Sequence, residues 1–457
     1  MQRRWVSVMV LLWGCEARTA PGVSVDARVD AGALDRAMLE VSAGDATAGD
    51  AEGLDAGPSA RDGGVGDAGS DLDARATGDS GDGRDGGDGA AADLGSNLRD
   101  AAGDVTPDAG PVTVLRVHHP SVAGRSFSLR GDLSGRLSWE RGVSFQRLDT
   151  STAEWRATGV SQTFEWKPLV DDQQWSRGQN YRAEPGQTVD VWPYFGESIG
   201  RWSRRFTLTS AELGNTRGVW VYLPPSYDEQ PTRRYPVIYL HDGQNLFDPA
   251  AAFGGQTWQV HDAMNAGIEA ATLCEAIVVG VENTSARIDE YTPTRDAQYG
   301  GGRGEAYLRF LRETVVPRVD AEFRTRADRA NRALMGSSLG GLISAYAGVR
   351  AADVFGLIGI LSPSSWWDGG VIVSEVASLA TRPVRPLRVY IDSGDSGPSQ
   401  DDVVNTRAHA DAWRRLGYRE GVDFRYLVAQ GATHTEAAWA ARLRPALEFL
   451  VGPRRND

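Results

Sequence analysis

Lysine is almost absent from this chain, cysteine is scarce, and no long apolar run occurs. Lys167 is the single lysine, so arginine carries nearly all of the positive charge. The two cysteines, Cys15 and Cys274, are too few for the set of paired disulfides that staples small secreted domains. A membrane-spanning helix needs about 20 apolar residues in a row, and no such stretch is present. These absences exclude a disulfide scaffold and a polytopic membrane protein.

The acidic residues are concentrated in one segment. The formal net charge is −13, and residues 16–111 alone hold 21 Asp and Glu against seven Arg. The remainder of the chain is therefore close to neutral and offers no basic footprint for a nucleic acid. Residues 16–111 are rich in Ala, Gly and Asp, so they cannot bury enough apolar surface to offset chain entropy. We expect a disordered linker there.

The N-terminus has the pattern of a secretory signal. A basic start at residues 1–4 precedes an apolar run at residues 5–13, which is too short to span a bilayer permanently. The sequence Leu-Trp-Gly-Cys at 12–15 resembles a bacterial lipobox, which implies that Cys15 is lipidated. We expect residues 1–15 to be a lipoprotein-type signal peptide. The protein would then be extracytoplasmic, anchored by its lipid to a membrane (the outer membrane is the expectation) or else simply secreted.

Residues 112–206 have the pattern of a small all-β domain. Short alternating runs are broken by Gly, Asp and Pro, as in a β-sandwich. Tryptophan is dense here, at Trp139, Trp155, Trp166, Trp175, Trp192 and Trp202.

Part of this segment is similar to the starch-binding carbohydrate-binding module family 20. The motifs are Leu-Ser-Trp-Glu at 137–140, Phe-Glu-Trp-Lys at 164–167, Trp175, and Asn-Tyr at 180–181. The resemblance implies that Trp139 and Trp175 stack on sugar rings, while Lys167 and Asn180 hydrogen-bond to a polysaccharide. Aromatic faces suit the apolar C–H faces of pyranose rings. The alternative is that these tryptophans only pack a sandwich core and the domain is a spacer.

Residues 207–457 alternate β-branched apolar runs with helical patterns. The expected strands are 219–223, 237–240, 276–281, 332–335, 356–361, 387–391 and 424–428, and the expected helices are 305–316, 339–349, 406–416 and 436–450. This alternation predicts a mostly parallel sheet covered on both faces, with ligands at the carboxyl ends of its strands. The fold class expected for the chain is α/β: an α/β-hydrolase fold preceded by a small β-sandwich and a linker.

Two Gly-x-Ser-x-Gly motifs compete for the role of nucleophile. Ser198, in residues 196–200, follows the β-domain and precedes an arginine-rich stretch without an amphipathic helical pattern. Ser338, in residues 336–340, follows an expected strand and precedes an apolar helix. A strand, a tight elbow and a helix are the context in which this motif exposes a nucleophilic serine. We therefore predict that Ser338 is the nucleophile and that Ser198 lies in a turn.

A serine hydroxyl needs a base, and His434 is the best placed of the six histidines. It follows the last expected strand and precedes the last helix, the usual position of the base in an α/β-hydrolase. The acid should follow the strand at 387–391. Asp395 is best placed in the turn beyond that strand, and the chain order Ser338, Asp395, His434 fits the fold. Three further carboxylates remain open as alternatives: Asp392, Asp401 and Asp402.

Several further motifs resemble the esterase family that includes enterochelin esterases, feruloyl esterases and mycolyltransferases. They are His-Asp-Gly-Gln-Asn-Leu-Phe at 241–247, Asp-Glu-Tyr-Thr-Pro at 289–293, Gly-Ser-Ser-Leu-Gly-Gly at 336–341, Ser-Pro-Ser-Ser-Trp-Trp at 362–367 and His-Thr-Glu-Ala-Ala-Trp at 434–439. The resemblance implies that the backbone N–H groups of Gln244 and Leu339 form an oxyanion hole. It also implies that His241 orders its loop and does not act as a second base.

The leading hypothesis is hydrolysis of a carboxylic ester through an acyl-enzyme on Ser338, without a cofactor or a metal ion. The ester would be a siderophore, an acylated glycan or a small ester. One alternative is acyl transfer to a sugar or lipid acceptor. A different class is a surface glycan-binding protein whose hydrolase domain is inert.

Overall fold

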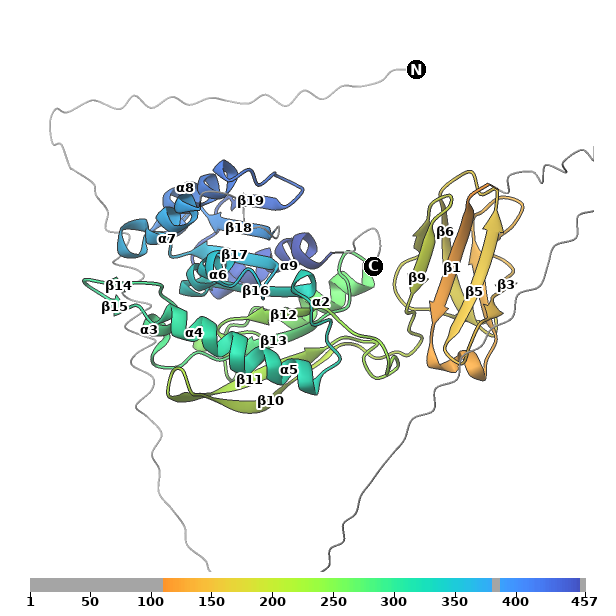
Figure 1. Ribbon diagram of the computed structural model, residues 1–457, viewed down its shortest axis with the longest axis horizontal. Coiled ribbons are helices and arrows are strands. Elements are labelled where there is room, and N and C mark those ends of the chain that lie inside the picture. The colour runs from red at the N-terminus through yellow and green to blue at the C-terminus, as the bar shows by residue number, and fades with distance from the viewer. Residues whose placement is uncertain (1–109, 380–386, 453–457) are drawn as a thin grey trace, which may run out of the picture. The chain divides into compact units, whose positions relative to one another are not determined.

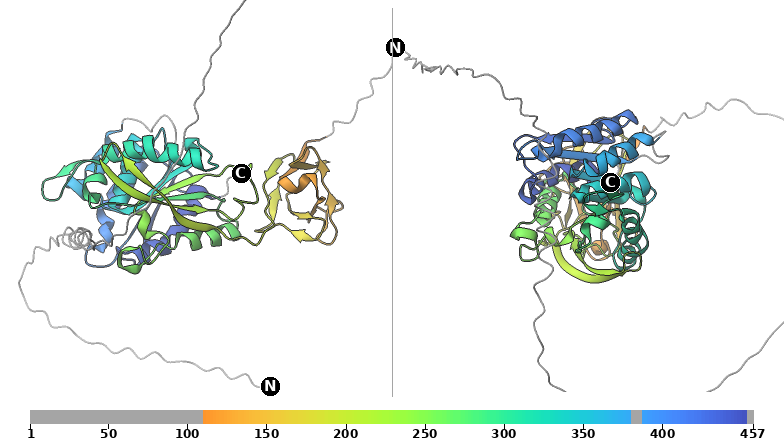
Figure 2. Two further views of the ribbon diagram at one scale, coloured as in Figure 1. Left: turned by 90° about the horizontal axis from the view of Figure 1, so that it is seen from below. Right: turned by 90° about the vertical axis from the view of Figure 1, so that its left-hand side faces the viewer.

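The protein is described by a computed structural model that covers residues 110–379 and 387–452 (Figures 1 and 2). The described residues divide into two compact units. One contains residues 110–173 and 180–191, and the other contains residues 174–179, 192–379 and 387–452. The expected signal peptide with Cys15, and nearly all of the expected linker, lie outside the described residues.

The first unit is built from two sheets. The four-stranded sheet has the order β4-β5-β1-β9, and the five-stranded sheet has the order β3-β2-β6-β7 with β8 beside β6; of these strands, only β7 falls in the segment 174–179 that is grouped with the second unit. The strands are β1 (Val112–His118), β2 (Phe127–Gly131), β3 (Val143–Ser144), β4 (Gln146–Arg147), β5 (Thr152–Thr158), β6 (Phe164–Val170), β7 (Gln174–Trp175), β8 (Tyr181–Ala183) and β9 (Thr188–Val191). A short 3₁₀ helix, η2 (Pro120–Ala123), follows β1.

Strand β6 shows why these residues form a two-layered β domain. Buried Phe164 and Trp166 alternate with exposed Glu165 and half-buried Lys167, which is the period-two pattern of a strand with one buried face. The ring of Phe164 meets that of Trp155 on β5 edge to face, with 6.3 Å between centroids. Because β5 and β6 belong to different sheets, aromatic side chains fill the space between the two sheets.

The second unit is built on an eight-stranded mixed sheet with the order β10-β11-β13-β12-β16-β17-β18-β19. The pairs β10–β11 and β11–β13 are antiparallel, and every later pair in this order is parallel. The strands are β10 (Arg201–Ser210), β11 (Asn215–Leu223), β12 (Val237–Leu240), β13 (Ile277–Val281), β16 (Arg332–Ser338), β17 (Leu357–Pro363), β18 (Arg388–Gly394) and β19 (Phe424–Ala429). A separate hairpin joins β14 (Arg295–Asp296) to β15 (Gly300–Gly301).

Helices cover both faces of this sheet, so the strands are apolar on both sides. In β12, Val237 and Tyr239 belong to one buried cluster, while Ile238 and Leu240 belong to another. The first cluster is covered by α4 (Gly304–Phe310), the π-helical η5 (Leu311–Val315), α5 (Val316–Glu322), α6 (Leu339–Arg350), α7 (Trp367–Ser378) and α8 (Val403–Arg415). The second cluster is covered by α2 (Val260–Glu269) and α9 (Glu436–Val451). The expected α/β class is thus confirmed for this unit.

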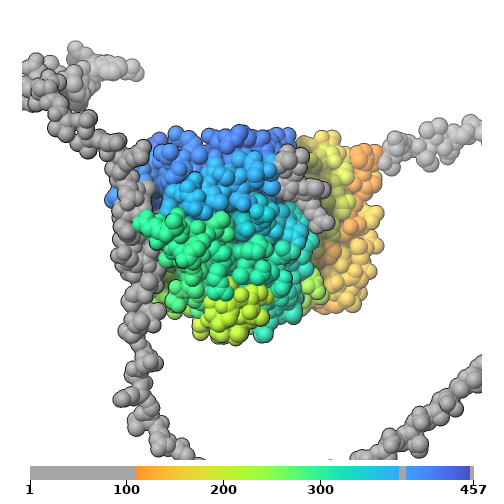
Figure 3. All heavy atoms as spheres, turned by 60° about the vertical axis from the view of Figure 1, so that its left-hand side comes forward, coloured from red at the N-terminus to blue at the C-terminus, as the bar shows by residue number. Residues whose placement is uncertain are grey.

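Short helical turns make up much of the rest. They are η3 (Gly243–Asn245), η4 (Phe253–Gly255), α3 (Arg287–Glu290), η6 (Arg329–Asn331) and η7 (Gln400–Asp402). Figure 3 shows segments coloured green to blue on the outside of the second unit. Two of these turns, η3 and η7, follow the carboxyl ends of β12 and β18, where a parallel sheet presents its ligand site.

The structure places the division between the units earlier than the sequence suggested. The expected boundary at 206/207 falls inside β10, which pairs with β11 from Arg201 opposite Leu223 to Ser210 opposite Asn215. The compact units divide at 191/192. Strand β10 is a largely exposed edge strand rich in arginine, so it lacks the apolar run that marked the other strands. Its sequence therefore resembled the end of the β domain.

A buried ion pair between β11 and α3 leads to a prediction about stability. The Arg217 guanidinium lies 2.9 Å from the Glu290 carboxylate, and both side chains are fully buried. Replacing Glu290 by glutamine leaves the guanidinium buried without a counter-charge. We expect the free energy of unfolding to fall by about 3 kcal/mol, as measured by urea denaturation followed by circular dichroism.

The matched control is the exposed pair of Arg318 and Glu322, which lie 2.9 Å apart within one helix. Glu322→Gln should change the free energy of unfolding by less than about 0.5 kcal/mol, because solvent screens exposed pairs. Equal effects of the two substitutions would contradict the role assigned to burial.

Candidate active site

Ser338 lies at the junction of β16 and α6. It is the last residue of the strand and has φ 56° and ψ −125°, a conformation that is strained for a residue with a side chain. The two glycines of the motif allow the backbone to turn this tightly. A Cβ atom at Gly336 would come within 2.8 Å of the Gly340 backbone and of the His241 ring. The strand, elbow and helix expected around Ser338 are therefore present.

The segment after β17 contacts the elbow directly. The Ser364 amide donates to the Ser338 carbonyl at 3.1 Å, and the two hydroxyl oxygens lie 3.3 Å apart, within hydrogen-bond distance. Ser364 is buried, and Ser338 is partly buried. The other motif serine, Ser198, instead donates its hydroxyl proton to the carbonyl of Pro225 at 2.7 Å and lies outside any helix or strand.

His434 lies in the loop between β19 and α9, and its ring contacts the carboxylate of Asp401. The Nδ1 atom lies 2.6 Å from Asp401 Oδ1. Burial would raise the pKa of Asp401, but hydrogen bonds from His434 and Ser362 outweigh it and lower that pKa. An ionised Asp401 accepts a hydrogen bond from the Nδ1–H group, so the lone pair of the neutral imidazole is on Nε2.

The carboxylate beside His434 is therefore not that of Asp395, which the sequence favoured. Asp395 Oδ1 accepts from the Gly431 amide at 2.7 Å, and the Asp395 amide donates to Ala432. Asp395 thus ties the loop after β18 to the loop after β19. The sequence favoured Asp395 because it is the first carboxylate beyond the strand. The loop instead brings Asp401, six residues later, to His434.

The other two carboxylates left open by the sequence also have different partners. Asp392 is fully buried, and its carboxylate lies 3.2 Å from Arg442 Nε and accepts from the Tyr390 hydroxyl at 3.1 Å. Burial raises the pKa of Asp392 to about 6, although Arg442 opposes the shift. Asp402 accepts a hydrogen bond from Asn405 at 2.6 Å.

The loop that carries Asp401 has an unusual backbone. Gln400, Asp401 and Asp402 have φ values of 51°, 49° and 51°, so three consecutive residues with side chains are left-handed. This backbone buries Asp401 completely, while Gln400 stays exposed.

The backbone N–H groups expected to form the oxyanion hole lie in the first turns of two helices. Gln244 is the second residue of η3, and Leu339 is the first residue of α6. The first N–H groups of a helix have no acceptor within that helix, so they are available to an oxyanion.

Asp242 anchors the loop that carries Gln244. It has φ 55° and accepts two hydrogen bonds from Arg287, at 2.8 and 2.9 Å, and one from Asn283 at 2.6 Å. The side-chain oxygen of Gln244 in turn accepts from the backbone N–H of Asn283 at 3.2 Å. Two neighbouring elements therefore hold this loop in place.

His241, which precedes this anchor, is buried, and its Nδ1 lies 2.9 Å from the Tyr307 hydroxyl. Burial lowers the pKa of His241 to about 3, so the ring is neutral at physiological pH. His241 is thus a neutral, buried residue of this loop, and its role in ordering the loop stays a prediction.

The sequence of the second unit matches a known family. The sequence model of the family described as "Putative esterase" matches residues 210–450, which is more than half of the chain. The chain belongs to this esterase family. It is a carboxylic ester hydrolase, and its second unit has the α/β-hydrolase type of fold.

Three known proteins illustrate the sequences that this esterase resembles. It is 26% identical over 262 residues to the uncharacterized protein YbbA of Bacillus subtilis. The aligned region covers 55% of this chain and 98% of YbbA. It is 24% identical over 270 residues to an endo-1,4-beta-xylanase/feruloyl esterase of Xylanibacter ruminicola, covering 58% of this chain and 34% of that protein. It is 32% identical over 185 residues to an iron(III) salmochelin esterase of Escherichia coli, covering 39% of this chain and 40% of that protein. The esterase thus spans YbbA almost completely but less than half of the other two.

Of the residues expected to bind a glycan, Trp175 and Asn180 are exposed, while Trp139 and Lys167 are half-buried. Lys167 on β6 lies opposite Arg130 in the antiparallel register with β2. The Arg130 guanidinium donates to the Trp139 carbonyl at 3.3 Å. Asn180 donates to Glu165, which is two residues from Lys167 on the same face of β6, at 3.0 Å. Trp175 is 38% exposed and belongs to the segment 174–179, which groups with the α/β unit.

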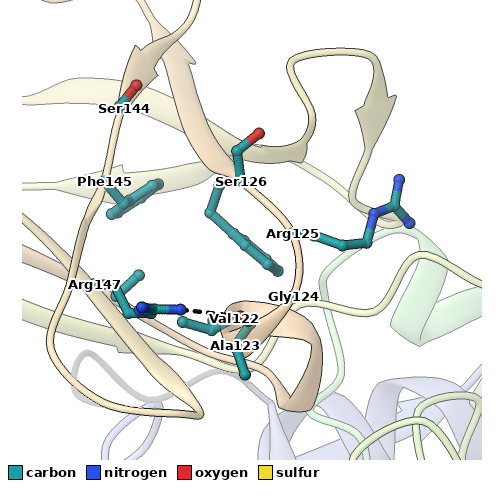
Figure 4. A pocket seen from close by; sticks show the side chains of 10 residues that line it. Val122, Ala123, Gly124, Arg125, Ser126, Ser144, Phe145 and Arg147 are labelled. Atoms are coloured by element: carbon teal, nitrogen blue, oxygen red, sulfur yellow. Dashed lines mark hydrogen bonds between the residues drawn. The ribbon is translucent and has the colours of Figure 1, made fainter.

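A pocket of about 370 Å³ lies elsewhere in the β unit (Figure 4). Its lining is Val122, Ala123, Gly124, Arg125, Ser126, Phe127, Ser144, Phe145, Arg147 and Ala153. Arg147 donates to the Ala123 carbonyl at 2.9 Å across it. None of the four expected glycan-binding residues lines this pocket.

The described residues contain neither a membrane-spanning helix nor a metal-binding cluster. No helix within residues 110–379 and 387–452 is long and apolar enough to cross a membrane. In the same part of the chain, no group of three His, Cys, Asp or Glu side chains is arranged to hold a metal ion.

Sequence reasoning missed the side chains that support the site. Ser362 and Arg442 contact Asp401, Trp439 donates to Ser362, and Arg287 holds the loop of Gln244. Ser362 and Trp439 stood within quoted motifs, but only their proximity in space shows what they contact. A buried arginine on an otherwise apolar helix face was the one signal that could have identified Arg442.

Proposed function

We propose that the esterase hydrolyses its substrate through an acyl-enzyme on Ser338, with His434 as general base and Asp401 as the acid that orients it. Two observations carry this proposal: the 2.6 Å contact between His434 Nδ1 and Asp401 Oδ1, and the strained elbow backbone of Ser338. Nε2 of His434 takes the hydroxyl proton as Ser338 Oγ attacks the ester carbonyl.

The reaction then proceeds in two balanced steps. Collapse of the tetrahedral intermediate breaks the bond to the alkoxy group, which leaves as an alcohol with the proton from His434. Water next attacks the acyl-enzyme, gives a proton to the same nitrogen, and releases the acid. The backbone N–H groups of Gln244 and Leu339 stabilise the charge that develops on the carbonyl oxygen in both steps, each by about 2.7–4 kcal/mol.

The proposed substrate is an extracytoplasmic ester: a siderophore, an acylated glycan or a small ester. A relative named as a salmochelin esterase supports the first, and one named as a xylanase and feruloyl esterase supports the second. The lipobox-like residues 12–15 support a location outside the cytoplasm, with attachment to a membrane through a lipid on Cys15. Acyl transfer to a sugar or lipid acceptor would use the same acyl-enzyme, with an alcohol in place of water.

A second role, glycan binding by the β unit, is favoured by one observation. The only lysine of the chain, Lys167, occupies the position expected from the starch-binding modules and lies on the same face as Glu165, the partner of Asn180. We propose that Trp139 and Trp175 stack on sugar rings while Lys167 and Asn180 hydrogen-bond to them.

The proposed function is tested by turnover and by active-site labelling of the full chain. We expect hydrolysis of p-nitrophenyl acetate and butyrate, and labelling by a fluorophosphonate probe. Peptide mapping should find the label on Ser338 and not on Ser198, because only the former has an activating base. No turnover and no label would overturn the enzyme proposal and leave glycan binding as the function.

A further inference from the structure

A buried serine after β17 occupies a costly backbone conformation. Ser362 is fully buried and has φ 37°, which is left-handed backbone for a residue that is not glycine. Its amide donates to Asp392 Oδ1 at 3.3 Å. A strained non-glycine residue persists only where its surroundings hold it, and such residues gather at functional sites. Glycine would adopt this backbone without strain, so a serine at this position should contribute something through its side-chain hydroxyl.

That hydroxyl has three partners, which together fix the direction of its proton. Trp439 Nε1 donates to Ser362 Oγ at 3.0 Å, and Arg442 NH2 donates to it at 2.6 Å. Indole and guanidinium groups can only donate, so both lone pairs of the oxygen are occupied. The remaining hydroxyl proton therefore goes to Asp401 Oδ2, which lies 2.6 Å away.

The two oxygens of Asp401 consequently have separate tasks. Oδ1 accepts from His434, while Oδ2 accepts from the Ser362 hydroxyl and from the Gly394 amide. With Oδ2 held on two sides, the carboxylate cannot rotate without breaking hydrogen bonds in a buried place. Ser362 thus aims the other oxygen at the histidine.

The ring of Trp439 adds a second restraint. It meets the His434 ring edge to face, with 4.9 Å between centroids, while its N–H donates to Ser362. Arg442 is held in turn by Asp392, 3.2 Å from its Nε. Two residues further along the chain, Ser364 contacts the elbow of Ser338. One short segment therefore touches both ends of the proposed triad.

We infer that Ser362 is a positioning residue of this esterase, whose hydroxyl fixes Asp401 in the orientation that His434 requires. The inference rests on the proposed function, because it assumes that Asp401 and His434 act in ester hydrolysis. Ser362 itself touches neither the substrate nor the reacting atoms. Arg442 and Trp439 support it, and each also contacts the pair directly: Arg442 NH2 lies 3.7 Å from Asp401 Oδ2, and the Trp439 ring meets that of His434.

The test compares Ser362→Ala and Ser362→Gly with Ser365→Ala in the full chain. Ser365 is a buried serine of the same segment, but its hydroxyl bonds to His409 at 3.1 Å, outside the proposed triad. We expect the two Ser362 variants to lose about 20-fold in kcat with less than about twofold change in KM, the scale of a hydrogen bond to a charged group. Ser365→Ala should keep kcat within about twofold of the wild type.

The glycine variant separates the hydroxyl from the backbone. Glycine adopts φ 37° readily, so it relieves the strain while it removes the hydrogen bond. Wild-type kcat in Ser362→Gly would overturn the inference, since strain and not the hydroxyl would then be the cause of the loss in Ser362→Ala. Because glycine suits this backbone, the test also remains decisive if the alanine variant does not fold.

A double-mutant cycle with Asp401→Asn tests whether Ser362 acts through Asp401. In that background, Ser362→Ala should cost less than about threefold, because the carboxylate that it positions is already gone. A full 20-fold loss in both backgrounds would overturn the inference.

A spectroscopic readout keeps this result distinct from the proposed function. The low-field Nδ1 proton of His434 should shift in Ser362→Ala and stay unchanged in Ser365→Ala, whether or not any ester is turned over. An unchanged proton in Ser362→Ala would refute the positioning role. A shifted proton in a protein without turnover would refute only the proposed function.

Discussion

Ser338→Ala is expected to lower kcat for p-nitrophenyl butyrate by about 10⁵-fold, because the acyl-enzyme cannot form without the hydroxyl. The oxyanion donors and substrate binding remain, so the residual rate should exceed that of the free ester in buffer by about 10³- to 10⁴-fold. The measurement is initial rates at saturating substrate, with the folded state checked by circular dichroism. Alanine suits the size of the site, and the elbow keeps its glycines.

Ser198→Ala is the matched control, since it alters the serine of the other Gly-x-Ser-x-Gly motif. The Ser198 hydroxyl only donates to the carbonyl of Pro225. Its loss should leave kcat within about twofold of the wild type. If Ser198→Ala abolished turnover and Ser338→Ala did not, the choice between the two motifs would be reversed.

Asp401→Asn should lower kcat by about 10³- to 10⁴-fold with little change in KM. An asparagine amide can offer its N–H₂ group to His434, which turns the imidazole to the wrong tautomer and removes the charge that stabilises the imidazolium. The side chain keeps its shape, so the loss reports on charge and proton position. Steady-state kinetics on p-nitrophenyl butyrate would measure it.

Asp395→Asn serves as its control, because the two aspartates lie in the same loop. The amide oxygen of asparagine can still accept from Gly431, as the carboxylate does. We expect kcat to change by less than about threefold. A large loss in Asp395→Asn together with a mild one in Asp401→Asn would restore the assignment that the sequence favoured.

Much of the α/β unit could be predicted because its signals are local. Each expected strand from 219–223 to 424–428 corresponds to a strand of the sheet. Most of these strands are buried and form continuous apolar runs, whereas the partly exposed edge strand β19 is marked by its aromatic and β-branched residues. Ser338 was found from a strand, an elbow and a helix that adjoin in sequence. Strand β10 was missed for the converse reason: it is exposed and charged, so no apolar run marks it.

The acid and its supports could not be predicted, because their partners come from distant segments. Asp395 and Asp401 are equally acidic and follow the same strand, so only the path of the loop decides which one meets His434. Ser362 is likewise one serine among several in its motif. The two donors that occupy its lone pairs come from a helix more than 70 residues away in sequence.

The left-handed run at residues 400–402 has a consequence for engineering this enzyme. Each such residue costs about 1–2 kcal/mol, a sizeable share of the 5–15 kcal/mol that stabilises a typical domain. At the exposed residue Gln400, exchange for glycine should therefore raise the free energy of unfolding and cost the enzyme little activity. At Asp401 the same exchange would relieve the backbone but leave the buried donors of His434, Ser362 and Gly394 without their acceptor. Efforts to stabilise this enzyme should accordingly relax the run at its exposed end and leave its buried centre unchanged.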